Sequence, residues 1–142
     1  MTIDGLIESL NPKANRDSVF KSGEGAGQSG SFFFFSHDKK YIIKTMTPSE
    51  LDLFLRILPD YEVHLKENPN SLLARHYGVY TVEMAEIATV HLILMANTLA
   101  FKDGSQIQRV FDLKGSLVDR RVKIDGHIKP TSCLKDLNFL QI

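Results

Sequence analysis

The chain has 142 residues, of which 43% are hydrophobic and 24% are charged, and its formal net charge at pH 7 is zero. This composition is typical of one soluble globular domain, and it provides no overall field for binding nucleic acid. A single cysteine, Cys133, excludes an internal disulfide and favours a reducing, intracellular compartment. No apolar run is long enough to cross a bilayer and residues 1–10 lack a signal-peptide profile, so any membrane contact is expected to be peripheral.

The charges are distributed unevenly along the chain. Residues 48–70 contain five acidic and two basic side chains, a net charge of −3. Residues 109–129 contain six basic and three acidic side chains, a net charge of +3. The second segment is therefore the predicted surface for an anionic partner.

A glycine-rich segment follows a polar lead-in segment, residues 1–22. Residues 25–31 have the sequence Gly-Ala-Gly-Gln-Ser-Gly-Ser, in which glycines without a Cβ let backbone N–H groups approach phosphate oxygens. A Rossmann unit requires this spacing to open a helix, whereas four phenylalanines, which favour a strand, follow here. A Walker A loop is excluded because no Gly-Lys-Ser/Thr closes the pattern.

Residues 31–46 are predicted to form a β-hairpin that turns at residues 37–40. Lys44 lies on its second strand, and alternation places Ile42 and Met46 on the same face, so its ammonium needs an anionic partner. A glycine-rich hairpin followed by a strand lysine is the nucleotide-binding arrangement of kinases. A flexible surface loop with an edge-strand lysine is the structural alternative.

A helix is predicted to begin after Thr47, which would be the N-cap, with Pro48 in the first turn and Glu50 completing a capping box. Its apolar stripe should pack on the hairpin sheet. Pro59 is expected to end this helix, with a second turn or short helix over 60–67. The stripe comprises Leu51, Phe54, Leu55 and Leu58.

Further strands are predicted over residues 76–83, 89–95 and 108–113. Asp125-Gly126 is a hairpin-turn signal within residues 122–129. Two strands, a helix and more strands predict an α+β lobe with a largely antiparallel sheet.

Several segments together resemble the phosphatidylinositol phosphate kinase (PIPK) family. The resemblance covers about residue 23 to the C-terminus and implies a partial PIPK catalytic domain over 23–142, with a kinase-like N-lobe, a hinge and the start of a C-lobe. The matching segments are the glycine-rich run 25–33, IIKT at 42–45, NPNSLLAR at 68–75, YGVY at 77–80, FDLKGS at 111–116 and LKDLNFL at 134–140.

The resemblance implies an ATP- and Mg²⁺-dependent lipid kinase that phosphorylates the inositol ring of a phosphoinositide. The favoured substrate is a phosphatidylinositol monophosphate, which would give phosphatidylinositol bisphosphate. Lys44, Asp112 and Lys114 would be the catalytic residues, and no metal ligand is expected within this chain. Lys44 would also contact the nucleotide, together with a phosphate-covering loop and a hinge. The loop residues are Gly27, Ser29, Gly30 and Ser31, and the hinge residues are Met95, Asn97 and Leu99.

Arg120, Arg121 and Lys123 are expected to meet lipid phosphates, because basic residues near an anionic leaflet contribute about 1 kcal/mol each. A solvated surface is the alternative for these three residues. The expected location is cytoplasmic, peripheral at the cytosolic face of a membrane, with the plasma membrane favoured. The expected partners are the phosphoinositide and an anionic membrane surface, with no nucleic acid, and a homodimer remains open.

The sequence also departs from the family pattern. The family's MDYSLL-like catalytic loop, its later metal-binding aspartate and its activation loop have no match in these residues, which favours a fragment that is inactive by itself. Gln28 stands where some members have lysine, and Asn138 replaces a frequent aspartate. A non-catalytic module that binds nucleotide or phosphoinositide is the alternative. Within enzymes, residues 108–123 also resemble the phosphatidylinositol 3-phosphate 5-kinase branch, whereas KDLNFL favours the monophosphate kinases acting at the 4- or 5-position.

Overall fold

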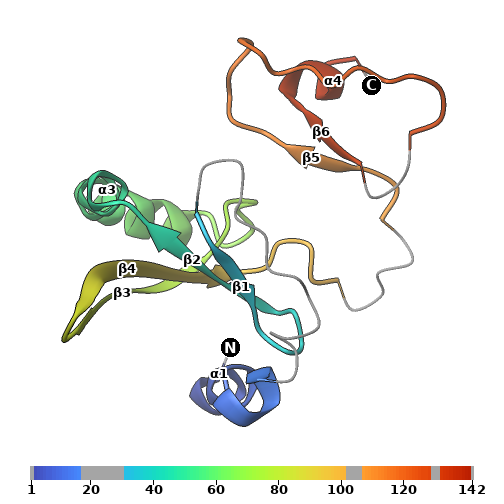
Figure 1. Cartoon of the computed structure of the whole chain (residues 1–142). Coiled ribbons are helices and arrows are strands. Elements are labelled where there is room, and N and C mark those ends of the chain that lie inside the picture. Colours follow the sequence, from blue (N-terminus) through green and yellow to red (C-terminus); the bar gives the residue numbers. More distant parts are fainter. Residues whose placement is uncertain (1, 17–30, 102–106, 129–131, 142) are drawn as a thin grey trace. The chain divides into compact units, whose positions relative to one another are not determined.

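The computed structural model describes residues 2–16, 31–101, 107–128 and 132–141. The chain divides into two compact units, Met1–Ala100 and Phe101–Ile142 (Figure 1). The first unit contains α1 (Ile3–Ser9), β1 (Phe33–Phe35), β2 (Tyr41–Met46), α3 (Pro48–Glu67), β3 (His76–Met84) and β4 (Ile87–Ala96). The second unit contains β5 (Val110–Asp112), β6 (Cys133–Lys135) and α4 (Asp136–Phe139).

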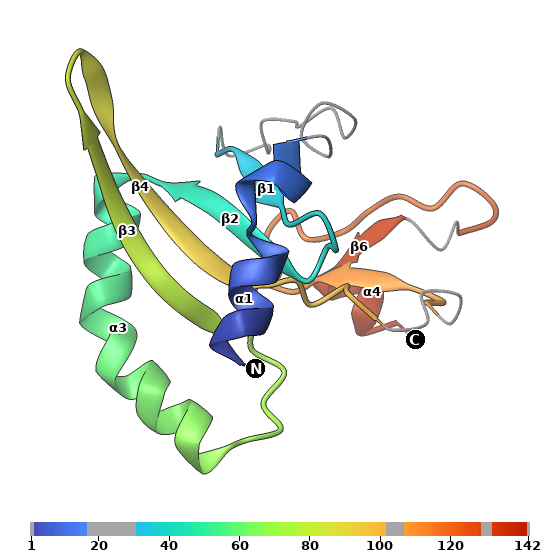
Figure 2. The same ribbon diagram turned by 90° about the horizontal axis from the view of Figure 1, so that it is seen from below.

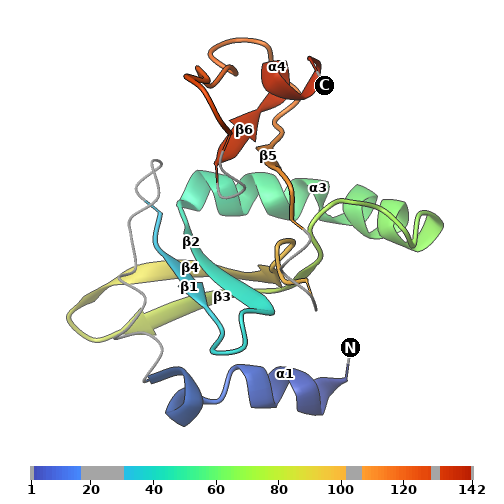
Figure 3. The same cartoon turned by 90° about the vertical axis from the view of Figure 1, so that its right-hand side faces the viewer.

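An antiparallel sheet with the strand order β1-β2-β4-β3 forms the centre of the first unit. Helix α3 lies on one face of this sheet and α1 on the other (Figures 1 and 3). The buried apolar side chains of the unit are Tyr41, Phe54, Ile93 and Leu94. The predicted α+β class, with an antiparallel sheet and a packed helix, is confirmed.

The first hairpin forms as predicted over residues 31–46, with Lys44 of β2 paired to Phe33 of β1 and to Ile93 of β4. Lys39 in its turn has a φ of 58°, and the Asp38 carboxylate accepts hydrogen bonds from the hydroxyls of Ser9 and Ser36, both at 2.7 Å. The turn is therefore tied to the end of α1. Strands β3 and β4 form the second hairpin, which extends beyond β2 (Figure 2).

Helix α3 begins as predicted. Thr47 is the N-cap, Pro48 occupies the first turn, and Glu50 completes a capping box. The expected break at Pro59 is wrong, because α3 runs through the proline to Glu67 and has 20 residues in all. Proline removes one backbone donor from a helix, but Tyr61, beyond the proline, is fixed by tertiary contacts. Its hydroxyl donates to the carbonyl of Ala74 (2.8 Å) and accepts the backbone N–H of His76 (2.9 Å).

The apolar stripe of α3 packs only in part. Phe54 is buried and its ring lies edge-on to His76, with ring centroids 5.1 Å apart. Leu55 and Leu58 stay exposed, contrary to the expectation that the whole stripe would cover the sheet. Burial of the imidazole lowers the pKa of His76, so the neutral ring is favoured beneath the helix.

The second unit differs more from the prediction. Strands β5 and β6 pair in parallel, with Val110 opposite Cys133 and Asp112 opposite Lys135, and α4 follows β6 at once. The hairpin signalled by Asp125-Gly126 does not form strands in residues 122–128, although Gly126 has the expected positive φ of 91°. Leu134 is the most deeply buried side chain of this unit among its described residues.

Candidate active site

Lys44 and Glu50 are joined at the start of α3. The Lys44 Nζ atom lies 3.1 Å from Glu50 Oε1, and the Lys44 side chain is 23% exposed. The other oxygen, Oε2, accepts the backbone N–H of Thr47 at 2.7 Å. The Thr47 N–H and then the Lys44 ammonium lower the pKa of Glu50, so the carboxylate stays ionised beside the lysine.

Glu50 thus has two roles, one for each carboxylate oxygen. Oε2 completes the predicted capping box, and Oε1 pairs with Lys44. The anionic partner that Lys44 needs beside its apolar neighbours is therefore the N-terminal glutamate of α3. A strand lysine held by a helix glutamate is a kinase-type arrangement, in which the lysine addresses nucleotide phosphates.

The loop that is predicted to cover the phosphates is described only at its last residue. Gly27, Ser29 and Gly30 lie outside the described residues. Ser31, two residues before the start of β1, is buried, and the backbone N–H of its neighbour Phe32 donates to the Thr45 hydroxyl at 2.9 Å. The loop thus returns to the sheet one residue along β2 from Lys44.

The expected hinge residues follow different courses at the end of β4. Met95 is paired with Ile42 and His76 within the sheet. The Asn97 amide donates to the carbonyl of Lys39 (2.7 Å) and accepts the N–H of Leu99 (3.1 Å), so its side chain is engaged by protein groups. Leu99 is exposed, and the boundary between the two units follows at Ala100.

Asp112 and Lys114 lie at the end of β5 and just beyond it. Their side chains are exposed, and Lys114 Nζ is 3.9 Å from Asp112 Oδ2. The same Asp112 oxygen lies 3.2 Å from the Arg120 guanidinium, which also donates to the Asp112 carbonyl. The structure therefore brings the two predicted residues together and adds Arg120 beneath them.

Arg120 does not lie on the surface with the other two predicted lipid contacts. Its side chain is 9% exposed, and its Nε atom lies 2.6 Å from Asp136 Oδ2. Arg121 and Lys123 are exposed, and an Arg121 Nη1 hydrogen bond reaches Gln141 Oε1 at 3.2 Å. The correction for Arg120 follows from charge pairing, because a buried guanidinium requires carboxylate partners.

Asp136 is a site residue that was not predicted from the sequence. In the sequence it stands out only as part of the KDLNFL segment, without an assigned role. Its Oδ1 atom accepts the backbone N–H groups of Lys114 (2.9 Å) and Gly115 (2.8 Å). Arg120 first, and then these amides, hold the pKa of the Asp136 carboxyl well below its usual range. Only the parallel pairing of β5 and β6 indicates this role, and no local sequence pattern reveals that pairing.

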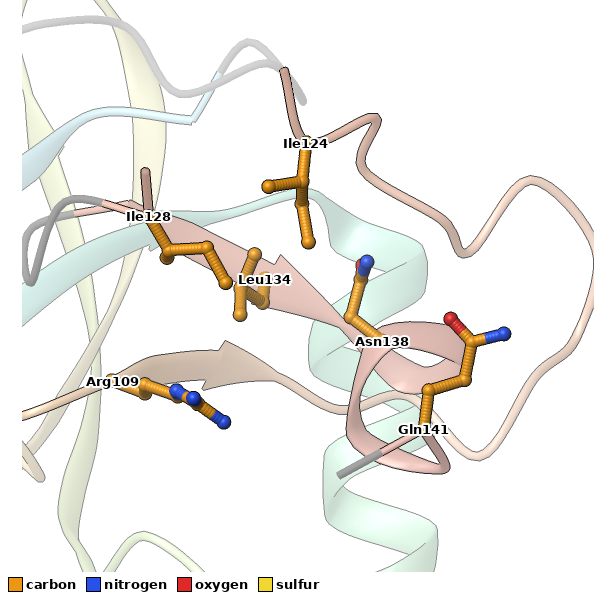
Figure 4. A pocket seen from close by; sticks show the side chains of 6 residues that line it. All are labelled: Arg109, Ile124, Ile128, Leu134, Asn138 and Gln141. Carbon is orange, nitrogen blue, oxygen red and sulfur yellow. The ribbon is translucent and has the colours of Figure 1, made fainter. Parts of the chain in front are cut away.

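Within the described ranges, residues of the second unit line two neighbouring pockets. The first, of about 410 Å³, is lined by aliphatic side chains, two amides and one guanidinium (Figure 4), which belong to Arg109, Ile124, Ile128, Leu134, Asn138 and Gln141. The second, of about 530 Å³, shares Arg109 and Ile128 with it. Neither pocket is lined by Asp112 or Lys114, so the candidate catalytic side chains face elsewhere.

Two classes of feature are absent from the described ranges. Within residues 2–16, 31–101, 107–128 and 132–141, no three histidine, cysteine or acidic side chains are placed to hold a metal ion. Over the same ranges, no helix is both long and apolar enough to cross a membrane.

The sheet, its packed helix and the lysine–glutamate pair define an N-terminal lobe of the kinase type. Comparison with known families matches residues 14–142 to Phosphatidylinositol-4-phosphate 5-Kinase. The chain therefore belongs to the phosphatidylinositol-4-phosphate 5-kinase family, and the resemblance to PIPKs is confirmed.

Three relatives illustrate the similarity. A probable phosphatidylinositol phosphate kinase of Dictyostelium discoideum is 38% identical over 97% of this chain and 19% of its own length. The phosphatidylinositol 4-phosphate 5-kinase its3 of Schizosaccharomyces pombe is 37% identical over 83% of the chain and 16% of its own length. The human phosphatidylinositol 4-phosphate 5-kinase type-1 alpha is 38% identical over 82% of the chain and 20% of its own length. The chain spans a fifth or less of these relatives.

Proposed function

We propose that this chain provides the nucleotide-binding lobe, the hinge and the first part of the C-lobe of a phosphoinositide kinase. The reaction would transfer the γ-phosphoryl group of ATP to an inositol-ring hydroxyl of a phosphatidylinositol monophosphate. The observation that carries the proposal is the Lys44–Glu50 pair, because Glu50 holds an ammonium on β2, the second strand after the glycine-rich loop. The family match and the relatives' names support the choice of substrate class.

The described residues fit a nucleotide. An ammonium has three donors, and Glu50 accepts one from Lys44, which leaves capacity for phosphate oxygens. Asn97 is fixed through its side chain and through its own N–H, which donates to the Lys40 carbonyl at 2.8 Å. Adenine contacts in the 95–99 segment would therefore come from its backbone.

Magnesium would arrive with the nucleotide, because Mg²⁺ is usually held by one or two carboxylates together with substrate phosphates. When bound, the ion neutralises charge on those phosphates. The Asp112 carboxylate, which is 46% exposed, and Lys114 beside it would address this phosphate–metal cluster, whereas the family's metal-binding aspartate has no match in these residues.

The protein would act mainly by positioning and by electrostatic stabilisation. Glu50 holds the Lys44 ammonium in place before nucleotide binds, so little reorganisation is needed. In the second unit, Arg120 orients the Asp112 carboxylate, and Lys114 adds a cation on its exposed side.

Nucleotide binding is the first test, because the motifs that carry the family's catalytic aspartates are not among these 142 residues. We expect the purified chain to bind a fluorescent ATP analogue, and ATP to displace it more effectively than AMP, because the loop and Lys44 address the β- and γ-phosphates. Equal displacement by AMP and ATP, or no binding, would contradict a nucleotide-binding lobe.

Membrane binding is proposed to use Arg121 and Lys123. Each basic residue near an anionic leaflet contributes about 1 kcal/mol, so replacing both with alanine should weaken vesicle binding by about one to two orders of magnitude. Co-sedimentation at low salt with phosphatidylcholine vesicles containing phosphatidylinositol 4-phosphate measures this. Added salt should weaken wild-type binding as well.

The matched control for this pair of substitutions removes two positive charges from the other unit. Arg56 and Lys66 are exposed on α3, and their double alanine variant has the same net charge as the Arg121/Lys123 variant. Equal losses of vesicle binding in the two double variants would show a response to net charge alone. Unchanged binding of the Arg121/Lys123 variant would show that these two residues are solvated surface charges without a role at the membrane.

A further inference from the structure

The turn after β5 is built around a carboxylate from another part of the sequence. Because β5 and β6 pair in parallel with Asp112 opposite Lys135, Asp136 stands beside the point where the chain leaves β5. Its Oδ1 atom accepts the consecutive N–H groups of Lys114 and Gly115 at 2.9 and 2.8 Å. Gly115 has a φ of 66°, a left-handed conformation that favours glycine.

Successive backbone N–H groups that converge in a turn with a left-handed residue form an anion-binding concavity. In this protein the concavity is filled by Asp136, whose side chain is about nine-tenths buried. The backbone of the DLKGS turn is therefore satisfied internally. A phosphate would meet the side chain of Lys114 rather than the amides of the turn.

Asp136 also reaches the other side of the turn through Arg120. Its Oδ2 atom lies 2.6 Å from Arg120 Nε, and the same guanidinium lies 3.2 Å from the Asp112 carboxylate. One carboxylate thus fixes the backbone that carries Lys114 and, through Arg120, orients Asp112. The two acids and two bases of this cluster balance in charge.

We propose that Asp136 is a positioning residue for the phosphate-directed pair Asp112 and Lys114. This inference rests on the proposed function for the role of that pair, but not for the geometry that Asp136 imposes. A purely structural alternative exists, because Asp136 is also the first residue of α4, where a negative charge is favourable.

The test separates positioning from stability by replacing the buried pair with apolar residues. A double Asp136→Leu, Arg120→Leu variant should stay folded, because apolar residues often replace a buried ion pair without loss of stability. Amide exchange at Lys114 and Gly115 should nevertheless rise about tenfold, since both lose a charge-assisted acceptor. Binding of Mg²⁺–ATP, measured by calorimetry, should weaken about tenfold.

Two further variants make the result unambiguous. Asp136→Asn keeps an acceptor oxygen but presents an NH₂ group to either Arg120 or the turn, so it should weaken Mg²⁺–ATP binding. This variant keeps the proposal testable if the leucine pair does not fold. Asp125→Asn, at an exposed aspartate of the same unit, should leave the Lys114 and Gly115 amides unchanged.

The outcomes separate the two proposals. Unchanged exchange at Lys114 and Gly115 in the folded leucine pair, or wild-type Mg²⁺–ATP affinity in Asp136→Asn, would overturn the positioning role. No Mg²⁺–ATP binding by the wild-type chain would contradict the proposed function, while the exchange measurement would still decide whether Asp136 sets the turn.

Discussion

A Lys44→Ala variant should bind ATP about ten to a hundred times more weakly than the wild-type chain. The loss follows from removing a charge-assisted contact to phosphate, which contributes about 1.5–3 kcal/mol. In a catalytically complete kinase containing this chain, most turnover should disappear as well, because a stabilising charge acts most strongly in the transition state. The fold should remain, since Glu50 keeps its hydrogen bond to the Thr47 N–H.

The matched control for Lys44 is Lys66→Ala. Lys66 lies in the same unit and also contacts a glutamate, with Nζ 2.7 Å from Glu62 Oε1, but its side chain is 71% exposed. We expect this variant to bind ATP as the wild type does. A third variant, Glu50→Gln, should weaken ATP binding less than Lys44→Ala, because the cation remains but is less firmly held. Fluorescent-nucleotide displacement measures all three, and wild-type affinity in Lys44→Ala would remove Lys44 from the nucleotide site.

The parts of the fold that local chemistry controls were predictable from the sequence. Thr47, Pro48 and Glu50 mark the start of α3 because capping depends on residues three positions apart. The turn at residues 37–40 and the alternation along β2 likewise gave the first hairpin and placed Lys44 among apolar neighbours. These features need no knowledge of distant contacts.

Pro59 shows where local chemistry was insufficient. Its cost to a helix is about 3 kcal/mol, which justified the expected break. The helix continues because contacts on both sides of the proline offset that cost. Phe54 is buried before it, and Tyr61 after it binds the backbone at Ala74 and His76, which are remote in sequence.

The second unit was the least predictable part of the candidate site. Asp112 and Lys114 were both predicted as catalytic residues, and their side chains lie together, with Lys114 Nζ 3.9 Å from Asp112 Oδ2. The burial of Arg120 and the role of Asp136 depend on the parallel pairing of two three-residue strands separated by 20 residues. Strands this short have no periodicity from which pairing or register can be read.

Asn138 illustrates the same dependence, because the sequence marked it only as a departure from a frequent aspartate. The side chain is buried, and its Oδ1 accepts the N–H of Val122 at 2.9 Å while its Nδ2 donates to the Val122 carbonyl at 3.0 Å. The amide therefore pairs with one residue as a backbone partner would. A carboxylate reproduces the acceptor but not the donor.

An Asn138→Asp variant should consequently destabilise the second unit by about 1–3 kcal/mol at pH 7, because it leaves a buried carbonyl facing a carboxylate. The repulsion raises the folded-state pKa of the new acid above its unfolded value, near 3.9. Its destabilisation should therefore be full above the folded pKa and decrease as the pH falls through it, since a protonated acid can donate to Val122.

Urea unfolding followed by the amide resonances of β5 and β6 measures this effect, because all four tyrosines lie in the first unit and report only on it. Gln141→Glu is the matched control. It makes the same amide-to-acid change at an exposed residue of the second unit, where the new charge would face Arg121, and it should not destabilise. The contradicting result is a urea midpoint of the second unit that is the same in Asn138→Asp as in the wild type at pH 7. The hydrogen bond from Asn138 Nδ2 would then contribute nothing to stability, and the contact with Val122 would not be what holds residues 120–123 against α4.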